Sequence, residues 1–321
     1  MSFRACAAAI GIGALVATAS AAAADDCHLK QVASLPTKIT ADGRLLVDAG
    51  INGEAVKLLL NTGAVRSLLD PDFVKSRNMP WNENTGTRGY GLTGKSLTGW
   101  TRVSLLTLGN VTARNQSFSF GSIGGDGAPV GLLADDFLAA NDVEIDPAAG
   151  RVNLFSPDHC TGKVVYWAKE YSRLPLFLTS AHRPEVEITI GGETLHALID
   201  TGTAATTMRL AVARRLFGVE PNSADPSLHT TVAGVDGVKI DSFPHRFDSL
   251  TFGDITLRNP EIQVADIDSA KGAVNNGSHM TGSVVQPDVM IGMSLLRRLH
   301  LFIAYSEPAL YYTVAEPTPT E

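Results

Sequence analysis

Apolar and polar residues alternate along two stretches of the chain that begin 139 residues apart. The first stretch runs from Val47 to Leu60 and is interrupted at Asn52-Gly53, and the second runs from Val186 to Ile199 and is interrupted at Gly191-Gly192. Alternation with a period of two predicts strands with one buried face, and a two-residue glycine-containing interruption predicts a tight hairpin turn. Both stretches are therefore predicted to be β-hairpins.

The similarity between the two halves continues downstream of the hairpins. Residues 106–115 match residues 250–259, with six of the ten pairs identical. Further along, Leu132 to Leu138 matches Met290 to Leu296, and each of these segments is followed by one more apolar stretch that predicts strand. The first copy starts near Leu45 and the second near Glu185. This repeat predicts an all-β protein built from two copies of one unit.

The repeat and the composition of the segments between the copies predict five parts of the chain. These are a signal peptide at 1–24, an N-terminal lobe at 25–155, a linker at 156–183, a C-terminal lobe at 184–314 and a tail at 315–321. The stretch from Ser156 to Pro184 contains Val164 to Trp167 and three prolines, which suggests a linker with one connecting strand.

The N-terminus has the order of residues found in secretory signal peptides. Arg4 is followed by an apolar stretch from Ala5 to Ala19 and by small residues that end at Ala24. The alternative is an uncleaved membrane anchor, but an Ala-rich stretch barely reaches the roughly 20 apolar residues that a span requires. We therefore expect export to the periplasm or the exterior, with no stable membrane insertion after processing.

Composition and charge narrow the classes of partner. Hydrophobic residues make up 44% of the chain and charged residues 18%, which is typical of a folded globular protein. The formal net charge is −7, and removal of residues 1–24, whose only charged residue is Arg4, changes it to −8. An acidic protein is a poor ligand for nucleic acid. The 321 residues suffice for two lobes with their own cores, and we expect a monomer.

The cysteines suggest one disulfide. Cys6 lies in the predicted signal peptide, so the mature chain keeps only Cys27 and Cys160. In an oxidising compartment two cysteines favour a disulfide, and two buried thiols are the alternative.

A three-residue motif closes the second strand of each predicted hairpin. It reads Asp200-Thr201-Gly202 in the second copy and Asn61-Thr62-Gly63 in the first. On these residues the chain resembles the retropepsin-like and pepsin-like aspartic peptidases, specifically the exported bacterial kind with two tandem units. In that family an apolar-apolar-Gly segment packs behind the Asp-Thr-Gly turn, and Met290-Ile291-Gly292 matches it. The first copy departs from the family pattern at Asn61 and at Ala134.

The resemblance implies a bilobal pepsin-like fold with a single cleft between the lobes and with Asn61 and Asp200 facing each other at its floor. It implies that the hydroxyl groups of Thr62 and Thr201 hydrogen-bond across the lobe interface, with Gly63 and Gly202 completing the turns. The glycine-rich segment around Tyr90 lies where the family has a flap that closes over the substrate. The alternative for Tyr90 is an ordinary exposed hairpin.

The chemistry of the family depends on a pair of carboxyl groups. Two carboxyls about 3 Å apart share one proton and together activate a water molecule for attack on a peptide carbonyl. Asn61 has the shape of an aspartate but cannot give up or take the proton. The leading hypothesis is an aspartic peptidase-like hydrolase that acts on a peptide or protein substrate. The alternative is a pseudopeptidase that binds peptides without cleaving them.

Other chemistries find little support. Residues 89–96 match the phosphate-binding motif Gly-x-x-x-x-Gly-Lys-Ser, but an NTPase needs an apolar strand before the motif and a helix after it, and neither is predicted here. No two of the eight histidines, and no histidine and cysteine, have metal-ligand spacing. The chain has no Gly-x-Ser-x-Gly motif of serine hydrolases. We expect neither a metal nor a cofactor.

Overall fold

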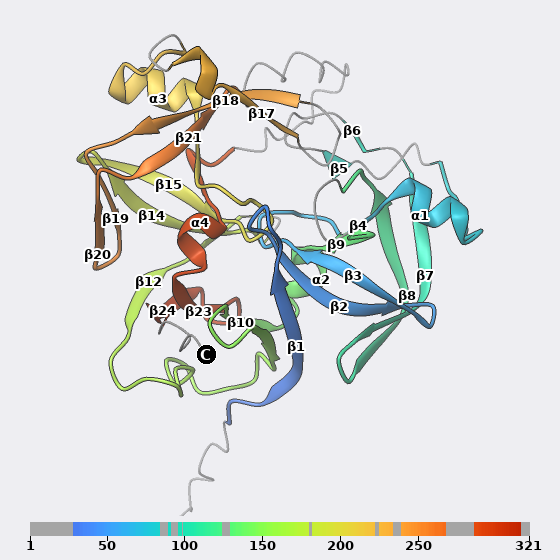
Figure 1. Ribbon diagram of the computed structural model, residues 1–321. Helices are drawn as coiled ribbons and strands as arrows, with labels where there is room; N and C mark the ends of the chain where they lie inside the picture. The colour runs from blue at the N-terminus through green and yellow to red at the C-terminus, as the bar shows by residue number, and fades with distance from the viewer. Residues whose placement is uncertain are drawn as a thin grey trace, which may run out of the picture.

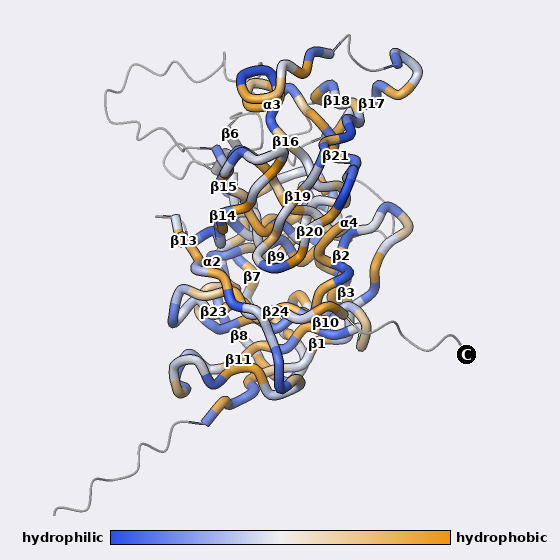
Figure 2. The backbone as a smooth tube through the Cα atoms, turned by 90° about the vertical axis from the view of Figure 1, so that its left-hand side faces the viewer, coloured by the Kyte–Doolittle hydropathy of each residue, from blue (hydrophilic) through white to orange (hydrophobic). Residues whose placement is uncertain are grey.

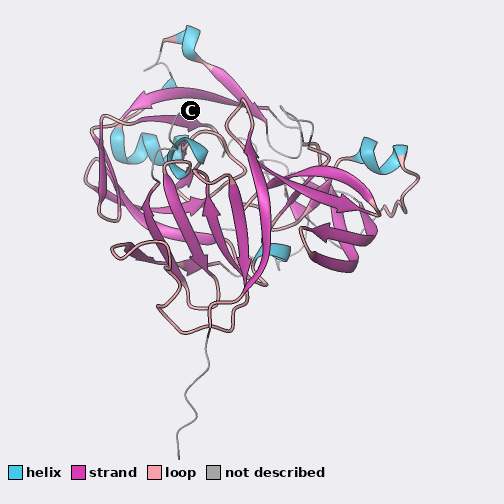
Figure 3. Ribbon diagram, turned by 60° about the horizontal axis from the view of Figure 1, so that its bottom comes forward, coloured by secondary structure: helices cyan, strands magenta, loops and turns pink. Residues whose placement is uncertain are grey.

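Strands make up most of the molecule, and the few helices are short (Figure 3). The computed structural model describes residues 28–83, 89–90, 96–97, 99–123, 129–179, 182–221, 225–233, 239–267 and 286–315. The predicted signal peptide at 1–24 lies outside the described residues, as do residues 316–321 of the predicted tail.

The strands of the first half of the chain, which we call unit one, are β1 Gln31–Ile39, β2 Leu45–Ile51, β3 Glu54–Leu60, β4 Leu68–Leu69, β5 Gly89–Tyr90, β6 Ser96–Leu97, β7 Trp100–Leu108, β8 Val111–Phe120, β9 Gly131–Leu133, β10 Asp142–Asp146 and β11 Arg151–Phe155. Its helices are α1 Pro71–Ser76 and α2 Asp135–Leu138.

The strands of the second half, unit two, are β12 Ser172–Pro175, β13 Phe177–Leu178, β14 Pro184–Ile190, β15 Glu193–Ile199, β16 Thr207–Arg209, β17 Thr230–Ala233, β18 Lys239–Arg246, β19 Ser249–Phe252, β20 Ile255–Arg258, β21 Glu261–Ala265, β22 Val289–Ile291, β23 Leu299–Ala304 and β24 Ala309–Val314. Its helices are α3 Leu210–Phe217, α4 Met293–Leu296 and a 3₁₀ turn at Pro226–Leu228.

The predicted hairpins form as expected. In unit one β2 pairs with β3 in the register Ile51 to Glu54, and in unit two β14 pairs with β15 in the register Ile190 to Glu193. The backbone φ angles are 52° at Asn52 and 88° at Gly53. Positive φ at both central residues suits a two-residue turn to the right-handed twist of the strands, which explains the Asn-Gly sequence.

Each unit is a strongly curved mixed sheet in which β3 and β15 each have one parallel partner, β9 and β22, and the two units share a third sheet. In unit one β7 pairs with both β8 and β2, so the sheet closes on itself. The shared sheet has the order β12-β24-β23-β10-β11-β1, and β10 of unit one pairs with β23 of unit two. Figure 1 shows unit two at the upper left and unit one at the right, with β1, β10, β23 and β24 between and below them. The protein therefore has the all-β, bilobal pepsin-like fold.

The strands at the start of the units belong to two sheets. In unit one, Gln31 to Pro36 of β1 pair with β11 in the shared sheet, and Thr37 to Ile39 pair with β2. In unit two, β12 pairs with β24 of the shared sheet, and β13 pairs with β14. These paired segments tie each lobe to the shared sheet.

The duplication reaches further upstream than the sequence pattern indicates. In unit one, Arg44 N donates to Thr40 Oγ1 at 2.8 Å and Thr40 N donates to Arg44 O. In unit two, Arg183 N donates to Thr179 Oγ1 at 3.2 Å and Thr179 N donates to Arg183 O. The same turn therefore precedes β2 and β14 at the same spacing.

The segment predicted as a linker carries a strand, but at a different place from the apolar residues that suggested one. Val164 to Trp167 have no strand assignment, whereas Ser172–Pro175 form β12. Val164 is fully buried against Phe302 and Tyr311 of the shared sheet. The apolar residues of this segment cover a sheet instead of extending it.

The largest hydrophobic core cluster contains residues from both units. It draws on alternate positions of the strands, such as Leu58 and Leu60 of β3 and Ala197 and Ile199 of β15. Figure 2 shows apolar and polar segments following one another along the backbone of both units. Burial of these side chains is the main source of stability for each lobe.

Candidate active site

The two Thr-Gly turns lie at the ends of equivalent strands. Asn61 follows β3, and its backbone N–H donates to Leu133 O of β9 at 2.9 Å. Asp200 follows β15, and its N–H donates to Ile291 O of β22 at 3.0 Å. In both units the first of these strands pairs in parallel with the second. The later apolar segment of each repeat thus supports the turn of its own unit.

The hydroxyl groups of Thr62 and Thr201 join the turns across the interface between the units. Thr62 Oγ1 donates to Ile199 O at 2.6 Å, and Thr201 Oγ1 donates to Leu60 O at 2.8 Å. Each hydroxyl oxygen also accepts the backbone N–H of the other threonine at 3.2 Å. Both threonines are fully buried. These four reciprocal bonds fix the position of one turn relative to the other.

The glycines of the turns show how the side chains of Asn61 and Asp200 are placed. A Cβ atom added to Gly63 would lie 2.4 Å from Cγ of Asp200, and one added to Gly202 would lie 2.2 Å from Nδ2 of Asn61. Each polar side chain therefore packs against the glycine of the opposite turn. Any larger residue at either glycine would collide with it, and Asn61 and Asp200 face each other across the interface.

The two side chains have similar but unequal hydrogen bonds. Asp200 accepts the N–H of Gly202 at 2.9 Å and the hydroxyl of Thr203 at 2.7 Å. Asn61 accepts the N–H of Gly63 at 2.9 Å through Oδ1. Ala64 occupies the position that corresponds to Thr203, so the second donor is missing. The environment built to hold an anion is complete only around Asp200.

The pKa of Asp200 lies above its ordinary value. Burial raises the pKa, and the hydroxyl of Thr203, the N–H of Gly202 and the charge of Arg183 counteract that rise in part. The side chain of Asp200 is only 6% exposed. A raised pKa is suited to a carboxylate that takes a proton from water.

Comparison with known families agrees with this geometry. The family model described as aspartyl protease matches residues 47–137 and 186–295, which contain the two turns. The chain belongs to the aspartyl protease family. The family match supports a peptidase-like function, and no curated protein matches the chain.

Two solved structures are similar to this aspartyl protease family member. The crystal structure of aspartic proteinase from Irpex lacteus has a TM-score of 0.48 and 16% identity, covering 89% of this chain and 98% of that one. The crystal structure of Basic 7S globulin from soybean has a TM-score of 0.46 and 10% identity, covering 91% of this chain and 96% of that one.

A pair of hydroxyl-centred clusters supports the turns, and the sequence analysis did not identify them. In unit one, Ser67 Oγ donates to Asp136 Oδ1 at 2.7 Å and accepts the N–H of Ala134 at 3.0 Å. In unit two, Thr206 Oγ1 contacts Ser294 Oγ at 3.2 Å and accepts the N–H of Gly292 at 3.3 Å. These residues have the same offsets between the units as the turns and the later apolar segments, so alignment of the repeats could have found them.

Ala134 and Gly292 show why the family pattern has a glycine behind the turn. A Cβ atom at Gly292 would lie 2.4 Å from the carbonyl oxygen of Ala205 and 2.8 Å from that of Thr203. Ala134 carries such an atom, is fully buried and packs in a small apolar cluster with Ala64 and Leu132. The turn of unit one leaves room for a methyl group that the turn of unit two excludes.

The predicted flap is a hairpin in the part that the structure describes. Gly89 pairs with Leu97, and Tyr90 pairs with Ser96, in an antiparallel pair of strands. The side chain of Tyr90 lies outside the described residues, so its role in a flap stays a prediction. Strand β7 follows Leu97 closely, where a phosphate-binding loop would require a helix.

The predicted disulfide involves Cys27, which lies outside the described residues, so the pairing with Cys160 stays a prediction. Among the described residues, no three His, Cys, Asp or Glu side chains form a group that could hold a metal ion. No helix in this part of the chain has the length and apolar character needed to cross a bilayer.

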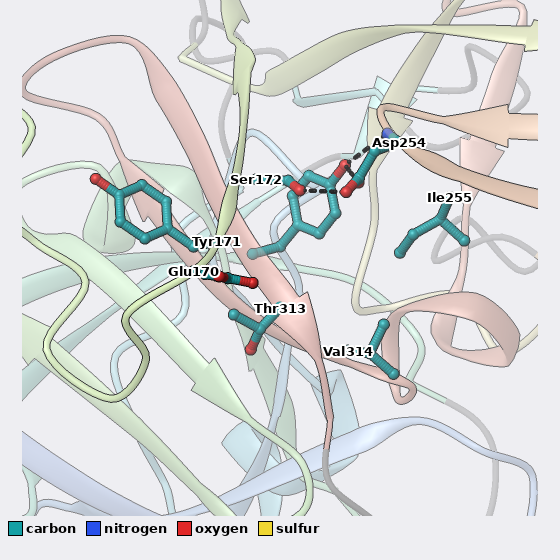
Figure 4. A pocket seen from close by; sticks show the side chains of 8 residues that line it. Glu170, Tyr171, Ser172, Asp254, Ile255, Thr313 and Val314 are labelled. Carbon is teal, nitrogen blue, oxygen red and sulfur yellow. Dashed lines mark hydrogen bonds between the residues drawn. The ribbon is translucent and has the colours of Figure 1, made fainter.

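A surface pocket of about 240 Å³ is lined by residues 170–172 at the start of β12, by Asp254 and Ile255 at the start of β20 and by residues 312–314 of β24, none of which belongs to the two Thr-Gly turns (Figure 4). Asp254 in this pocket accepts hydrogen bonds from Ser172 Oγ and from the hydroxyl of Tyr312, both at 2.6 Å. The polar side chains of Ser172, Asp254 and Tyr312 in the pocket are therefore hydrogen-bonded to one another.

Proposed function

We propose that this protein is an aspartic peptidase-like hydrolase of an exported compartment that cleaves peptide bonds in a peptide or protein substrate. The observation that carries the proposal is the set of reciprocal hydrogen bonds that Thr62 and Thr201 make across the interface, to each other and to the carbonyl oxygens of Leu60 and Ile199, which holds Asn61 and Asp200 face to face. Of these two side chains, only Asp200 has a carboxylate that could accept a proton from a water molecule placed between them.

The chemistry of this site differs from that of two paired carboxyls. Ionised Asp200 takes a proton from water as the oxygen attacks the peptide carbonyl. The amide of Asn61 orients the water or the carbonyl by hydrogen bonding but has no proton to transfer. The proton that Asp200 took from water therefore passes from Asp200 to the leaving nitrogen as the C–N bond breaks, which returns Asp200 to its ionised form. The raised pKa of Asp200 means that this base becomes available only as the pH rises through that pKa.

A second function is favoured by the asymmetry of the turns. Unit one lacks the carboxyl at Asn61 and, because Ala64 replaces the hydroxyl residue, lacks the second donor that would hold a carboxylate there. Both changes remove chemistry and leave the interface between the turns intact. A pseudopeptidase that binds peptides without cleaving them fits these two observations.

Two substitutions test the proposal. Asn61→Asp restores the second carboxyl and is expected to raise the rate of peptide hydrolysis at mildly acidic pH by about 10²–10⁴-fold, the usual contribution of one positioned proton-transfer group. Asp200→Asn is expected to abolish hydrolysis and to leave peptide binding in place, since the amide keeps the shape of the side chain. Rates against a mixed peptide library and binding of the same peptides give the two measurements.

The variants also decide between the two functions. Wild-type hydrolysis that Asp200→Asn removes supports the hydrolase. Peptide binding without any wild-type hydrolysis supports the pseudopeptidase. A folded Asn61→Asp variant with no gain in rate would contradict the assignment of position 61 to the reacting centre.

Export and the disulfide are inferred from the N-terminal residues 1–27, which lie outside the described residues. We infer processing near Ala24, export as a monomer and a Cys27–Cys160 disulfide, for which the chain-entropy argument gives a stabilisation of about 5 kcal/mol. N-terminal sequencing of exported protein and mass mapping under non-reducing conditions test these inferences. Retention of Arg4 or two free thiols would contradict them.

A further inference from the structure

Asp135 is a buried acid at a position where the repeated unit has an apolar residue. Asp135 begins helix α2, and its counterpart Met293 begins α4. The N–H of Asp135 donates to Ala64 O at 3.0 Å, and that of Met293 donates to Thr203 O at 2.8 Å. The two residues are 2% and 0% exposed. Unit one therefore has an amide at position 61 and a buried acid at 135, directly behind the same turn.

Only one of the two carboxyl oxygens of Asp135 accepts a hydrogen bond from the described residues. The hydroxyl of Tyr305, at the end of β23 in unit two, donates to Asp135 Oδ1 at 2.9 Å. Oδ2 has no hydrogen-bond partner among the described residues. A buried carboxylate with an unpartnered oxygen is costly, and such a group adopts its neutral, protonated form.

Asp135 is close to the Asp200 site through the backbone of the unit-one turn. Ala64, which accepts the N–H of Asp135, follows Gly63, and Gly63 packs against the carboxylate of Asp200. The pKa of Asp135 is raised to about 9, chiefly because the carboxyl group is buried. The hydrogen bond from Tyr305 and the charge of Arg183 lower this pKa, whereas the charges of Asp200 and Asp136 raise it. Arg183 also lowers the pKa of Asp200, so one cation acts on both carboxyls.

We propose that Asp135 is a positioning residue of this site, the neutral member of a carboxyl pair that carries a single negative charge, held on Asp200. Asp135 lies behind the turn and does not touch the substrate. In a site with two facing carboxyls, an acid at position 61 would share a proton with Asp200. Here Asp135 carries the proton instead, and Asp200 remains the group that acts on water. The inference rests on the proposed function only in this last assignment.

Carboxyl ¹³C NMR of protein labelled at the aspartate side chains tests the pairing without any need for hydrolysis. Asp135→Asn and Asp200→Asn identify the two signals by their loss. In the wild-type protein the Asp135 signal is expected to titrate near pH 9, and the Asp200 signal to show a second, small inflection at the same pH. The inflection should be absent from Asp135→Asn. In Asp200→Asn, the Asp135 step should move to lower pH, since the neighbouring charge is gone.

Two further variants keep the test decisive. Tyr305→Phe removes the donor to Oδ1 and leaves both acids in place, so the Asp135 step should move to higher pH. Asp136→Asn removes another nearby charge and should move the step by less than Asp200→Asn does. Circular dichroism at each pH establishes that the measured protein is folded. An Asp135 step that is unchanged in Asp200→Asn, or that moves equally in Asp136→Asn, would overturn the pairing.

Activity provides the functional part of the test. Ionised Asp135 would place a second negative charge behind the turn, where it disfavours the anionic intermediate of peptide hydrolysis. The rate is therefore expected to fall as the pH rises through about 9. In Asp135→Asn this alkaline decline should be absent, whereas Asp48→Asn, an exposed acid of β2, should keep it. An alkaline decline of the same size in Asp135→Asn would contradict the role, and complete loss of hydrolysis in wild type would contradict the proposed function but not the NMR result.

Discussion

At position 61 an amide replaces a carboxyl, and its surroundings differ from those of Asp200 by one hydroxyl group. The hydroxyl of Thr203 donates to Asp200, whereas Ala64 offers nothing equivalent to Asn61. An amide needs less stabilisation by donors than an anion, so the two differences are consistent with each other. For this reason Asn61→Asp combined with Ala64→Thr recreates the chemistry of Asp200 more fully than the single change.

The glycine behind the unit-two turn offers a test of packing at the same scale. Gly292→Ala places a methyl carbon 2.4 Å from the backbone carbonyl oxygen of Ala205, which cannot move without shifting the turn. We expect a loss of about 1–3 kcal/mol in the free energy of unfolding, the usual cost of overpacking. Urea denaturation measures it.

The reverse change at the equivalent position is the matched control. Ala134→Gly removes a buried methyl group and adds backbone freedom, for a loss of about 1 kcal/mol. No destabilisation by Gly292→Ala would show that the turn of unit two accepts a methyl group as the turn of unit one does.

The sequence predicted the residues of the two turns but not the acid behind them. Thr62 and Thr201 could be identified because a repeated motif at the end of a repeated strand is rare. Asp135 could not, since an acid in the first turn of a helix is common and the sequence gives no sign that this one is buried. Comparison of the repeats position by position, with Asp135 against Met293, is the signal that would have drawn attention to it.

Among the elements, the hairpins were the easiest to predict from the sequence, because their turns depend on the conformation of only two residues each. Asn52-Gly53 and Gly191-Gly192 all have positive φ, which few other residues adopt readily. The strands of the shared sheet are harder to predict, since β12 is short and its residues pair with residues of β24 that lie 134 to 140 positions away. Val164 to Trp167 have more apolar character than β12, yet they cover the sheet.

The segment between the units is attached to both of them by a histidine. His159 Nε2 contacts the carboxylate of Asp142 at the start of β10, and Nδ1 lies 3.2 Å from the carbonyl oxygen of Cys160. Ser306 of unit two also donates to Asp142, at 2.7 Å. Two acceptors around one imidazole ring favour the form in which both nitrogens carry a proton.

This contact predicts a dependence of stability on pH. Burial lowers the pKa of His159, but the hydrogen bond and charge of Asp142 outweigh it, so the pKa of the folded protein lies above the ordinary value of 6.5. The stabilisation is therefore fully present below pH 6.5 and is lost as the pH rises through the pKa of the folded state. Urea unfolding of wild type and His159→Gln at pH 6 and pH 8 should show a larger difference at pH 6. His229→Gln, which changes a histidine at an exposed position outside this contact, is the control variant.

For the whole molecule, the two-unit architecture could be predicted because the repeat extends over most of the chain. What the sequence did not reveal is how the units are joined. The six-stranded sheet takes β1, β10 and β11 from unit one and β12, β23 and β24 from unit two, and the pairing of β10 with β23 depends on residues about 160 positions apart. Contacts over such distances leave no local pattern in the sequence.

The shared sheet predicts that neither unit is complete by itself. A protein limited to residues 25–155 would expose the edge of β10 that pairs with β23, and it would lose the Tyr305 and Ser306 contacts to Asp135 and Asp142. An exposed edge strand favours association with other chains. We expect this fragment to self-associate or to lack cooperative unfolding, as measured by light scattering and urea denaturation against the 25–321 chain. A monomeric fragment with cooperative unfolding would show that the shared sheet is not required.

The two turns are related by approximate twofold symmetry in space, but each is encoded separately in one gene. If two identical chains met through the same threonine contacts, any mutation at this position would appear on both sides of the site, and loss of one carboxyl would mean loss of both. Joining the copies in a single chain removes that constraint. Positions 61, 64 and 135 can then change on one side while Asp200 and Thr203 stay unchanged on the other, so the unequal site is a result that two identical chains cannot reach.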